Sequence, residues 1–364
     1  MVGAHGTRRW AAFERVLEDA TLDAALVTHL PSVRYLTGFS GSSGVVLHSR
    51  LGSPALITDF RYEEQAAAEV AEPIRVHIAR EGWLAGLGEI VEEGGIERAG
   101  FEPEYLTVLD RDRLSARVPE IEWVPAPGLM TGLRTVKDRD EIERIRMAAT
   151  VAEGALERLI AAIDWSAGPT EMAVAAHLEF ELRSGGSGPL PFEPIVAGGP
   201  RTSLPHATPS GRAIGPGDLL LLDFGATVEG YCSDLTRTFV IGSAADWQTD
   251  AHAQVLAAQS EAIEAIRPGA SAATVDRTAR QVLASAEMDV FFGHGLGHGL
   301  GLEVHEAPRL SARSDDVLEP GNVVTVEPGV YLPGRGGVRI EDDVAVTRTG
   351  CRVLTSAPRD LIAL

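Results

Sequence analysis

The segment PGDLLLLDFG at residues 216–225 returns in altered form as PGNVVTVEPG at residues 320–329. Each copy has a Pro-Gly turn, four mostly apolar residues, an acidic residue and, two positions later, a glycine. A strand that is apolar on both sides is buried, so Asp223 and Glu327 each end a buried strand. We therefore predict two copies of one hairpin-bearing unit, each of which delivers a carboxylate.

The strand that returns in each hairpin carries a second acid. Asp234 follows Asp223 by eleven residues, and Glu341 follows Glu327 by fourteen. Side chains alternate between the two faces of a strand, which places Glu341 on the same face as Arg339. Four buried carboxylates repel one another strongly in a low-dielectric site. The strand ahead of Asp223 has no lysine or arginine, so a distant guanidinium or a cation must supply the partner charge that a buried carboxylate needs.

Three histidines lie in the segment HGLGHGLGLEVHE, residues 294–306. Glycine at every second position of its first part is incompatible with a stable helix, which excludes the helical H-E-x-x-H zinc site. Alternating glycines instead let backbone and substrate approach closely. One such histidine alone is more commonly a hydrogen-bonded core residue than a ligand, but three so close together indicate a functional group.

Four carboxylates and one imidazole form an oxygen-rich ligand set. Such a set favours Mn²⁺, Mg²⁺ or a similar ion over a metal that prefers thiolates. A pair of these ions about 3.5–4 Å apart can hold and deprotonate a water while it polarises a carbonyl, as amide hydrolysis requires. The residues therefore predict a two-metal hydrolase.

The chain has 364 residues, which predicts two domains. Residues 1–135 contain the strand-like apolar runs of a small α/β domain, at 24–28, 45–48, 55–59 and 74–78. Asp138 and Glu141 form the pattern of a capping box, so a long helix and a second domain, 136–364, should start there. Further helices are predicted at about 170–183, 250–266 and 272–286.

Charge and cysteine content exclude several classes of protein. With 32 basic and 52 acidic residues the formal net charge is −20, which would repel a nucleic acid backbone. No segment approaches the roughly 18 continuous apolar residues of a membrane-spanning helix. Two cysteines, Cys232 and Cys351, make neither a disulfide framework nor a C-x-x-C motif. We expect a cytoplasmic protein with no nucleic acid or membrane partner.

Five short motifs resemble those of the pita-bread metallopeptidases: LDFG at 222–225, SD at 233–234, GHG at 297–299, VEPG at 326–329 and RIED at 339–342. Within that family the chain looks like the proline-specific branch, prolidase and aminopeptidase P. VRYLTGF at 33–39 and TDFRY at 58–62 look like its N-terminal creatinase-like domain. The resemblance implies an α/β (α+β) protein, with a creatinase-like α/β domain before a pita-bread domain that has a pseudo-twofold repeat.

The resemblance also assigns the metal ligands. Asp223 would bind one divalent ion and His298 and Glu327 the other, while Asp234 and Glu341 would bridge the two. Glu327 would also be the general base. The ions would be Mn²⁺, with Co²⁺ or Zn²⁺ as alternatives.

Other site residues follow from the same resemblance. His206 and His305 match the two histidines that contact the scissile carbonyl or shuttle the proton, and Arg339 matches the arginine that orients a ligating aspartate. His294 and Arg313 are assigned to substrate binding. Arg313 would pair with the free carboxylate of a dipeptide, and Arg309 competes for that role.

The sequence is compatible with three functions. The first is hydrolysis of small proline-containing peptides: a prolidase cleaves Xaa-Pro dipeptides, and the alternative, an aminopeptidase P, acts on longer peptides. The second is a creatinase-like amidinohydrolase, which would lack the metal ligands that are all present here. The third is a binding protein that has kept the scaffold. The resemblance further implies a homodimer in which the N-terminal domain helps to close a neighbour's site.

Overall fold

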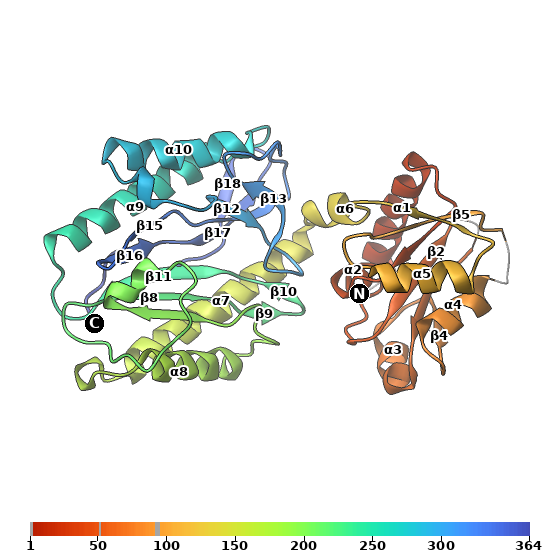
Figure 1. Ribbon diagram of the computed structural model, residues 1–364, viewed down its shortest axis with the longest axis horizontal. Helices are drawn as coiled ribbons and strands as arrows, with labels where there is room; N and C mark the ends of the chain where they lie inside the picture. The colour runs from red at the N-terminus through yellow and green to blue at the C-terminus, as the bar shows by residue number, and fades with distance from the viewer. Residues whose placement is uncertain (1–2, 51, 92–94) are drawn as a thin grey trace. The chain divides into compact units, whose positions relative to one another are not determined.

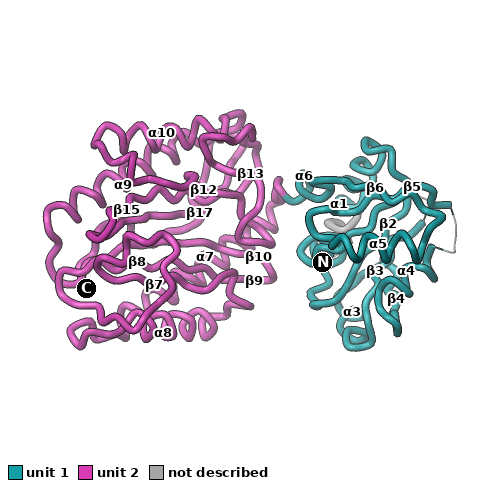
Figure 2. Tube along the Cα trace, viewed as in Figure 1, with its two compact units in different colours: residues 1–134 teal, residues 135–364 magenta. Residues whose placement is uncertain are grey.

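The computed structural model describes residues 3–50, 52–91 and 95–364. The chain divides into two compact units, unit 1 (Met1–Arg134) and unit 2 (Thr135–Leu364), which are coloured separately in Figure 2. Within the described ranges, no helix combines the length and the apolar character needed to cross a membrane.

The described residues of unit 1 form a six-stranded mixed sheet in the order β4-β3-β2-β1-β5-β6. Its strands are β1 (Ala24–Val27), β2 (Val45–Ser49), β3 (Ala55–Thr58), β4 (Arg75–Ile78), β5 (Arg98–Phe101) and β6 (Glu122–Pro125). The first four confirm the predicted strands. The apolar pattern does not single out β5 or β6, and β6 is a partly exposed edge strand.

Helices precede, separate and follow these strands along the chain. They are α1 (Gly3–Asp19), α2 (Leu30–Thr37), η1 (Phe60–Tyr62), α3 (Glu63–Glu69), α4 (Trp83–Val91), α5 (Val108–Arg117) and α6 (Thr131–Thr135). Strand β1 is buried at all its positions, as expected for a strand that is covered on both faces of its sheet. Unit 1 is therefore an α/β domain, as predicted.

Unit 2 begins with the long helix α7 (Arg139–Ala162). The predicted capping box is present: Asp138 Oδ1 accepts a hydrogen bond from the backbone N–H of Glu141 at 2.9 Å, and Glu141 Oε2 accepts one from the N–H of Asp138 at 2.9 Å. The predicted apolar face is buried at Ile145 and Leu159. It shares a core with helix α8 (Glu171–Ser184).

Unit 2 consists of two halves. The first has the helix pair α7 and α8 and a three-stranded antiparallel sheet, the second has a helix pair and a five-stranded antiparallel sheet, and each half also has a two-stranded sheet. The first-half elements are η2 (Trp165–Ala167), β7 (Ile195–Gly198), η3 (Gly199–Ser203), β8 (Leu219–Phe224), β9 (Thr227–Val228), β10 (Tyr231–Cys232) and β11 (Leu235–Val240). The second-half elements are α9 (Asp246–Ala265), α10 (Ala272–Ser285), η4 (Asp289–Phe291), β12 (Gly297–Gly299), β13 (Glu306–Leu310), β14 (Val323–Val326), β15 (Gly329–Leu332), β16 (Gly336–Arg339), β17 (Asp342–Val346) and β18 (Cys351–Val353). Figure 1 shows the strands between the pair α7 and α8 and the pair α9 and α10.

The predicted helices of unit 2 are all present. Helix α9 begins at Asp246, four residues before the predicted start, because its first turn is held by a polar contact and not by the apolar pattern. The side chain of Gln248 accepts a hydrogen bond from the backbone N–H of Ala245 at 2.8 Å.

The two Pro-Gly turns of the repeat have matching geometry. Gly217 and Gly321 have φ angles of 82° and 100°. Their N–H groups donate to the carbonyl oxygens of Ile241, just after strand β11, and Val346, the last residue of β17, at 2.7 and 2.9 Å. Each turn thereby starts a strand, β8 or β14, that pairs antiparallel with the strand carrying the second half of its hairpin. The predicted repeat is confirmed.

The helix pairs follow the same repeat. The residue just before the second helix of each pair, Thr170 or Ser271, forms an isolated antiparallel bridge with Ala213 or Val317 respectively. Both bridges lie just ahead of the Pro-Gly turns. The internal similarity therefore extends from the hairpins to the helices that cover them.

The two turn glycines give a matched test of the repeat. A non-glycine residue at positive φ costs about 1–2 kcal/mol, so Gly217→Ala should lower the free energy of unfolding by about that amount, because a Cβ there meets open space. Gly321→Ala should cost more, because its Cβ would lie 2.8 Å from the carbonyl oxygen of Lys137. Urea unfolding of both variants measures the difference, and equal losses would contradict this account of the second turn.

Candidate metal centre

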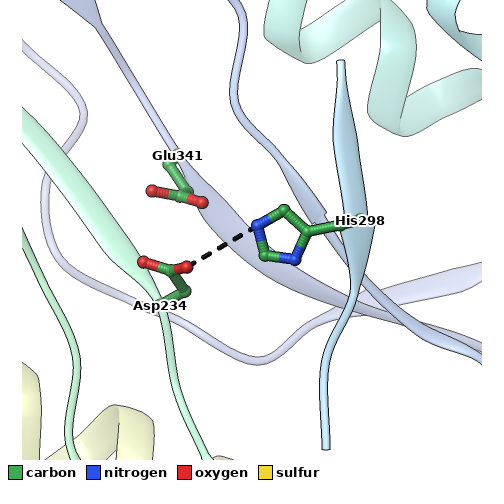
Figure 3. A group of neighbouring side chains, drawn as sticks. All are labelled: Asp234, His298 and Glu341. Atoms are coloured by element: carbon green, nitrogen blue, oxygen red, sulfur yellow. Dashed lines mark ion pairs between the residues drawn. The ribbon is translucent and has the colours of Figure 1, made fainter. Parts of the chain in front are cut away.

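Three predicted ligands converge between the two halves of unit 2. Ligand atoms of Asp234, His298 and Glu341 all lie within 4.8 Å of one another (Figure 3). Asp234 immediately precedes strand β11, His298 is the middle residue of β12, and Glu341 lies between β16 and β17. The first half thus supplies one of the three groups and the second half supplies two.

The imidazole of His298 also faces Glu327. Its Nε2 atom lies 3.4 Å from Glu327 Oε1 and 3.8 Å from Asp234 Oδ2. The other ring nitrogen, Nδ1, lies 3.1 Å from the carbonyl oxygen of Gly299. A proton on Nδ1 donates to that carbonyl and leaves the lone pair of Nε2 directed at the carboxylates, which is the tautomer that a metal-ligating histidine uses. Burial lowers the pKa of His298 to about 4, so the ring is neutral at pH 7.

Asp223 is held by a distant guanidinium. Nη2 of Arg339 donates a hydrogen bond to Asp223 Oδ2, and Nε of Arg339 donates to Thr236 Oγ1 at 3.1 Å. Thr236 in turn donates to Glu341 Oε2 at 2.6 Å. The sequence analysis predicted that a distant guanidinium or a metal cation would supply the partner charge of Asp223. The guanidinium of Arg339 does so at one of the two carboxylate oxygens. Arg339 therefore orients an acid on each side of the site.

Tyr331 is a site residue that the sequence analysis missed. Its hydroxyl accepts a hydrogen bond from Nη1 of Arg339 at 2.8 Å and lies 2.8 Å from Nε2 of His294. Tyr331 pairs with Gly337 across the β15–β16 hairpin, and a Cβ at Gly337 would lie 3.0 Å from the tyrosine ring. The signal available in the sequence was Gly337, two positions before Arg339, which leaves room for the aromatic ring of Tyr331 on the opposite strand.

Helix α10 holds the segment that carries His294, just ahead of strand β12. Arg280 pairs with Asp276 at 2.7 Å and donates hydrogen bonds to the carbonyl oxygens of Phe292 and His294. Asp276 accepts one from the N–H of Leu296 at 3.0 Å. These contacts fix the backbone on both sides of His294, whose ring lies edge-on against Phe292 at 5.0 Å.

His305 and His206 lie on the exposed side of the site. The ring of His305 lies 4.3 Å from that of His298, edge to face. Burial lowers the pKa of His305, and the charge of His206 acts in the same direction, so the three imidazoles share one region. The loop that carries His206 is attached to the site through the carbonyl oxygen of Pro205, which accepts a hydrogen bond from Arg339 at 3.3 Å.

A buried ion pair holds the loop next to His305. Lys137 Nζ lies 2.8 Å from Glu306 Oε2, and the two side chains are 1% and 6% exposed. The other carboxylate oxygen of Glu306 accepts a hydrogen bond from the N–H of Glu303 at 3.1 Å. The sequence analysis missed Lys137, because nothing in the local pattern indicates a partner 169 positions away.

The structure separates the two candidate arginines. Arg309 on β13 pairs with His298 on β12, and its charge contributes to lowering the pKa of both His298 and His305 after the larger effect of burial. Arg313 lies exposed in the turn beyond the end of β13. Within the described ranges, the structure records no contact between Arg313 and the predicted ligands.

The buried acids repel one another. Burial, and after it the charge of Glu341, raises the pKa of Asp234 well above its ordinary value. Burial and the charge of Glu327 do the same to Glu341. Burial raises the pKa of Glu327 to about 8, although Arg339 acts in the opposite direction. Within the described residues, Oδ1 of Asp234 is buried without a hydrogen-bond partner. Carboxylates that lack compensation beside a neutral imidazole fit a site for divalent cations.

Comparisons with known proteins show the family of the chain. Residues 143–348 match metallopeptidase family M24, and residues 9–136 match the creatinase/prolidase N-terminal domain. An Xaa-Pro dipeptidase of Pyrococcus horikoshii is 35% identical over 350 residues, which are 95% of this chain and 96% of that protein.

Two solved structures have the same fold over nearly the whole chain. An Xaa-Pro dipeptidase from Bacillus anthracis has a TM-score of 0.94 at 39% identity and covers 99% of this chain and 100% of its own. An X-Pro aminopeptidase from Thermotoga maritima has a TM-score of 0.89 at 36% identity and covers 96% and 100%. The predicted fold, a creatinase-like domain followed by a pita-bread domain, is confirmed.

The raised carboxyl pKa values predict how metal binding depends on pH. A raised pKa in the folded state stabilises the metal-free fold at low pH, and this stabilisation is lost as the pH rises from the ordinary 4.5 of Glu327 to its folded value of about 8. A cation removes the repulsion that causes this loss, so the rise in Tm on adding Mn²⁺ should be larger at about pH 8 than at about pH 6.

Differential scanning fluorimetry of the metal-free and Mn²⁺-saturated protein across this range measures the effect. His298, with its pKa lowered to about 4, stays neutral throughout and does not confound it. Asp234→Asn, which removes one buried charge, should show a smaller gain. A gain that is constant, or that shrinks as the pH rises, would contradict the prediction.

Proposed function

The chain belongs to metallopeptidase family M24, and we propose that it hydrolyses the peptide bond of Xaa-Pro dipeptides. The observation that carries the proposal is the convergence of Asp234, His298 and Glu341, with Glu327 on the same imidazole nitrogen. The similar proteins of Pyrococcus horikoshii and Bacillus anthracis that are named Xaa-Pro dipeptidases support the substrate class. The amidinohydrolase and binding-protein hypotheses explain neither the complete ligand set nor these similarities.

We propose that Asp223, Asp234, His298, Glu327 and Glu341 would hold two divalent ions. The oxygen-rich set favours Mn²⁺, with Co²⁺ or Zn²⁺ as alternatives. When bound, such ions lower the pKa of water and polarise a carbonyl oxygen. The side chains of this chain supply the rest of the chemistry.

Each remaining residue has a position that suits one task. Glu327, whose Oε1 lies 3.4 Å from Thr325 Oγ1, is the general base that accepts a proton from water. His305 and His206 lie exposed at the site and can donate to the scissile carbonyl or pass the proton to the leaving amine. Arg339 orients Asp223. His294, held by Tyr331, is assigned to the substrate.

We also propose a cytoplasmic homodimer. The two cysteines are free, Cys232 being buried and Cys351 partly buried, which suits a reducing compartment. The resemblance to the proline-specific enzymes supports a dimer in which the N-terminal domain helps to close a neighbour's site. Light scattering of the purified protein measures the oligomeric state.

A paired assay tests the substrate. Purified protein with Mn²⁺ should hydrolyse Ala-Pro, should act weakly or not at all on Ala-Pro-Ala, and should leave Ala-Gly, the control dipeptide without proline, largely intact. Cleavage of the tripeptide alone would replace the dipeptidase by an aminopeptidase, the activity named for the similar Thermotoga maritima protein. Failure on both proline peptides in the metal-loaded protein would reject the proposal.

The arginines offer a matched test of carboxylate recognition. A dipeptide places its free carboxylate close to the scissile bond, and Arg309 lies opposite His298 while Arg313 lies beyond the strand. Arg309→Leu should raise KM for Ala-Pro roughly 10-fold or more, because a charge-assisted hydrogen bond is worth about 1.5–3 kcal/mol. Arg313→Leu is the control, and the sequence prediction for Arg313 would be restored if this variant alone raised KM.

A further inference from the structure

Asp342, the residue directly after Glu341, is a buried centre of hydrogen bonds. Its Oδ1 accepts from Nη2 of Arg237 at 2.8 Å and from Oγ1 of Thr355 at 2.6 Å. Its Oδ2 accepts from Nε2 of Gln259 at 2.8 Å and pairs with Nε of Arg359 at 2.8 Å. The side chain of Asp342 is 1% exposed, so these donors compensate a charge that water does not reach.

Two of the donors also hold the backbone beside the metal ligands. Nη1 of Arg237 donates to the carbonyl oxygen of Glu341 at 2.6 Å. Nε2 of Gln259 lies 3.1 Å from the carbonyl oxygen of Val326, the residue before Glu327, and 3.3 Å from that of Ile340. Asp342 and its donors therefore join the strands from which both second-half acids project.

The next residue connects this centre to the first half. Oδ2 of Asp343 accepts a hydrogen bond from the N–H of Asp234 at 3.2 Å. Of the three consecutive residues 341–343, Glu341 is a proposed ligand, Asp342 anchors it, and Asp343 contacts Asp234, another proposed ligand. A shift of this short stretch would move Glu341 and loosen Asp234 together.

Thr355 and Arg359 reach Asp342 from the segment 355–364, which is itself firmly attached. Glu153 on α7 accepts hydrogen bonds from the N–H of Ala357 at 2.8 Å and from Oγ of Ser356 at 2.9 Å. The segment then runs beside strand β11, where the N–H of Val240 donates to the carbonyl oxygen of Ile362 at 3.0 Å. Arg359 is 29% exposed at the outer side of this centre, so it can be replaced with less disturbance than Arg237.

We propose that Arg359 and Thr355 are positioning residues for metal binding, which act through Asp342 to hold Glu341 in place. The inference rests on the proposed metal site and extends it to a segment outside the ligand strands. Partners that orient a metal ligand typically contribute about 10–100-fold to metal affinity. The segment 355–364 therefore sets how tightly the site holds its ions.

Matched variants test the inference. Arg359→Gln should weaken Mn²⁺ binding about 10-fold or more, and Thr355→Val should weaken it by a smaller factor. Arg352→Gln and Thr349→Val replace exposed residues of the same types nearby and should bind Mn²⁺ like the wild type. Arg359→Lys, which keeps the charge, should recover part of the affinity. Titration calorimetry on metal-free protein measures each Kd.

A second measurement separates positioning from simple loss of stability. Turnover of Ala-Pro by Arg359→Gln should be lowest at limiting Mn²⁺ and should recover as Mn²⁺ is raised. A variant that melts at lower temperature in the metal-free state but binds Mn²⁺ with wild-type affinity overturns the inference. If the wild type binds Mn²⁺ but cleaves neither Ala-Pro nor Ala-Pro-Ala, the proposed function fails, and the affinity difference between Arg359→Gln and Arg352→Gln still decides the positioning role.

Discussion

The structure of unit 2 depends on enclosing several carboxylates where its two halves meet. A buried carboxylate without a partner costs more than a hydrogen bond returns, and the strands that deliver Asp223 and Glu327 carry no lysine or arginine, so they bring no opposite charge with them. Two kinds of compensation are therefore required. Arg339 supplies a guanidinium to Asp223, whereas Asp234, Glu327 and Glu341 keep raised pKa values, which a bound divalent cation would relieve.

The repeat explains how such an unfavourable cluster is tolerated. Two strand pairs, each started by a glycine at positive φ, come from separate cores beneath separate helix pairs. Those cores are formed by hydrophobic side chains and contain none of the acids, so each half can hold its carboxylates in place against their mutual repulsion. Preorganised ligands of this kind lose little conformational freedom when an ion binds.

The fold was predictable because its signals are local and repeated. The apolar strands, the capping box at Asp138 and the paired Pro-Gly turns each leave a pattern within about ten residues, and the acids mark the ends of those strands. The support around the site leaves no such pattern. Lys137 with Glu306, Tyr331 with His294 and Arg237 with Asp342 are joined only by tertiary packing. Their register depends on how whole strands align, which spacing along the chain does not reveal.

Burial distinguishes the residues that would hold the metal ions from the residues that would take part in proton transfer. The proposed ligands and Arg339 are mostly enclosed, and donors such as Thr236 fix their oxygens, so their positions change little during a reaction. His206 and His305 are exposed and lie in loops, where a ring can turn toward a substrate. A proton that must travel between water and a leaving amine needs groups with access to both. In the proposed mechanism, the enclosed acids would hold the ions rigidly, and the exposed imidazoles of His206 and His305 would move the proton.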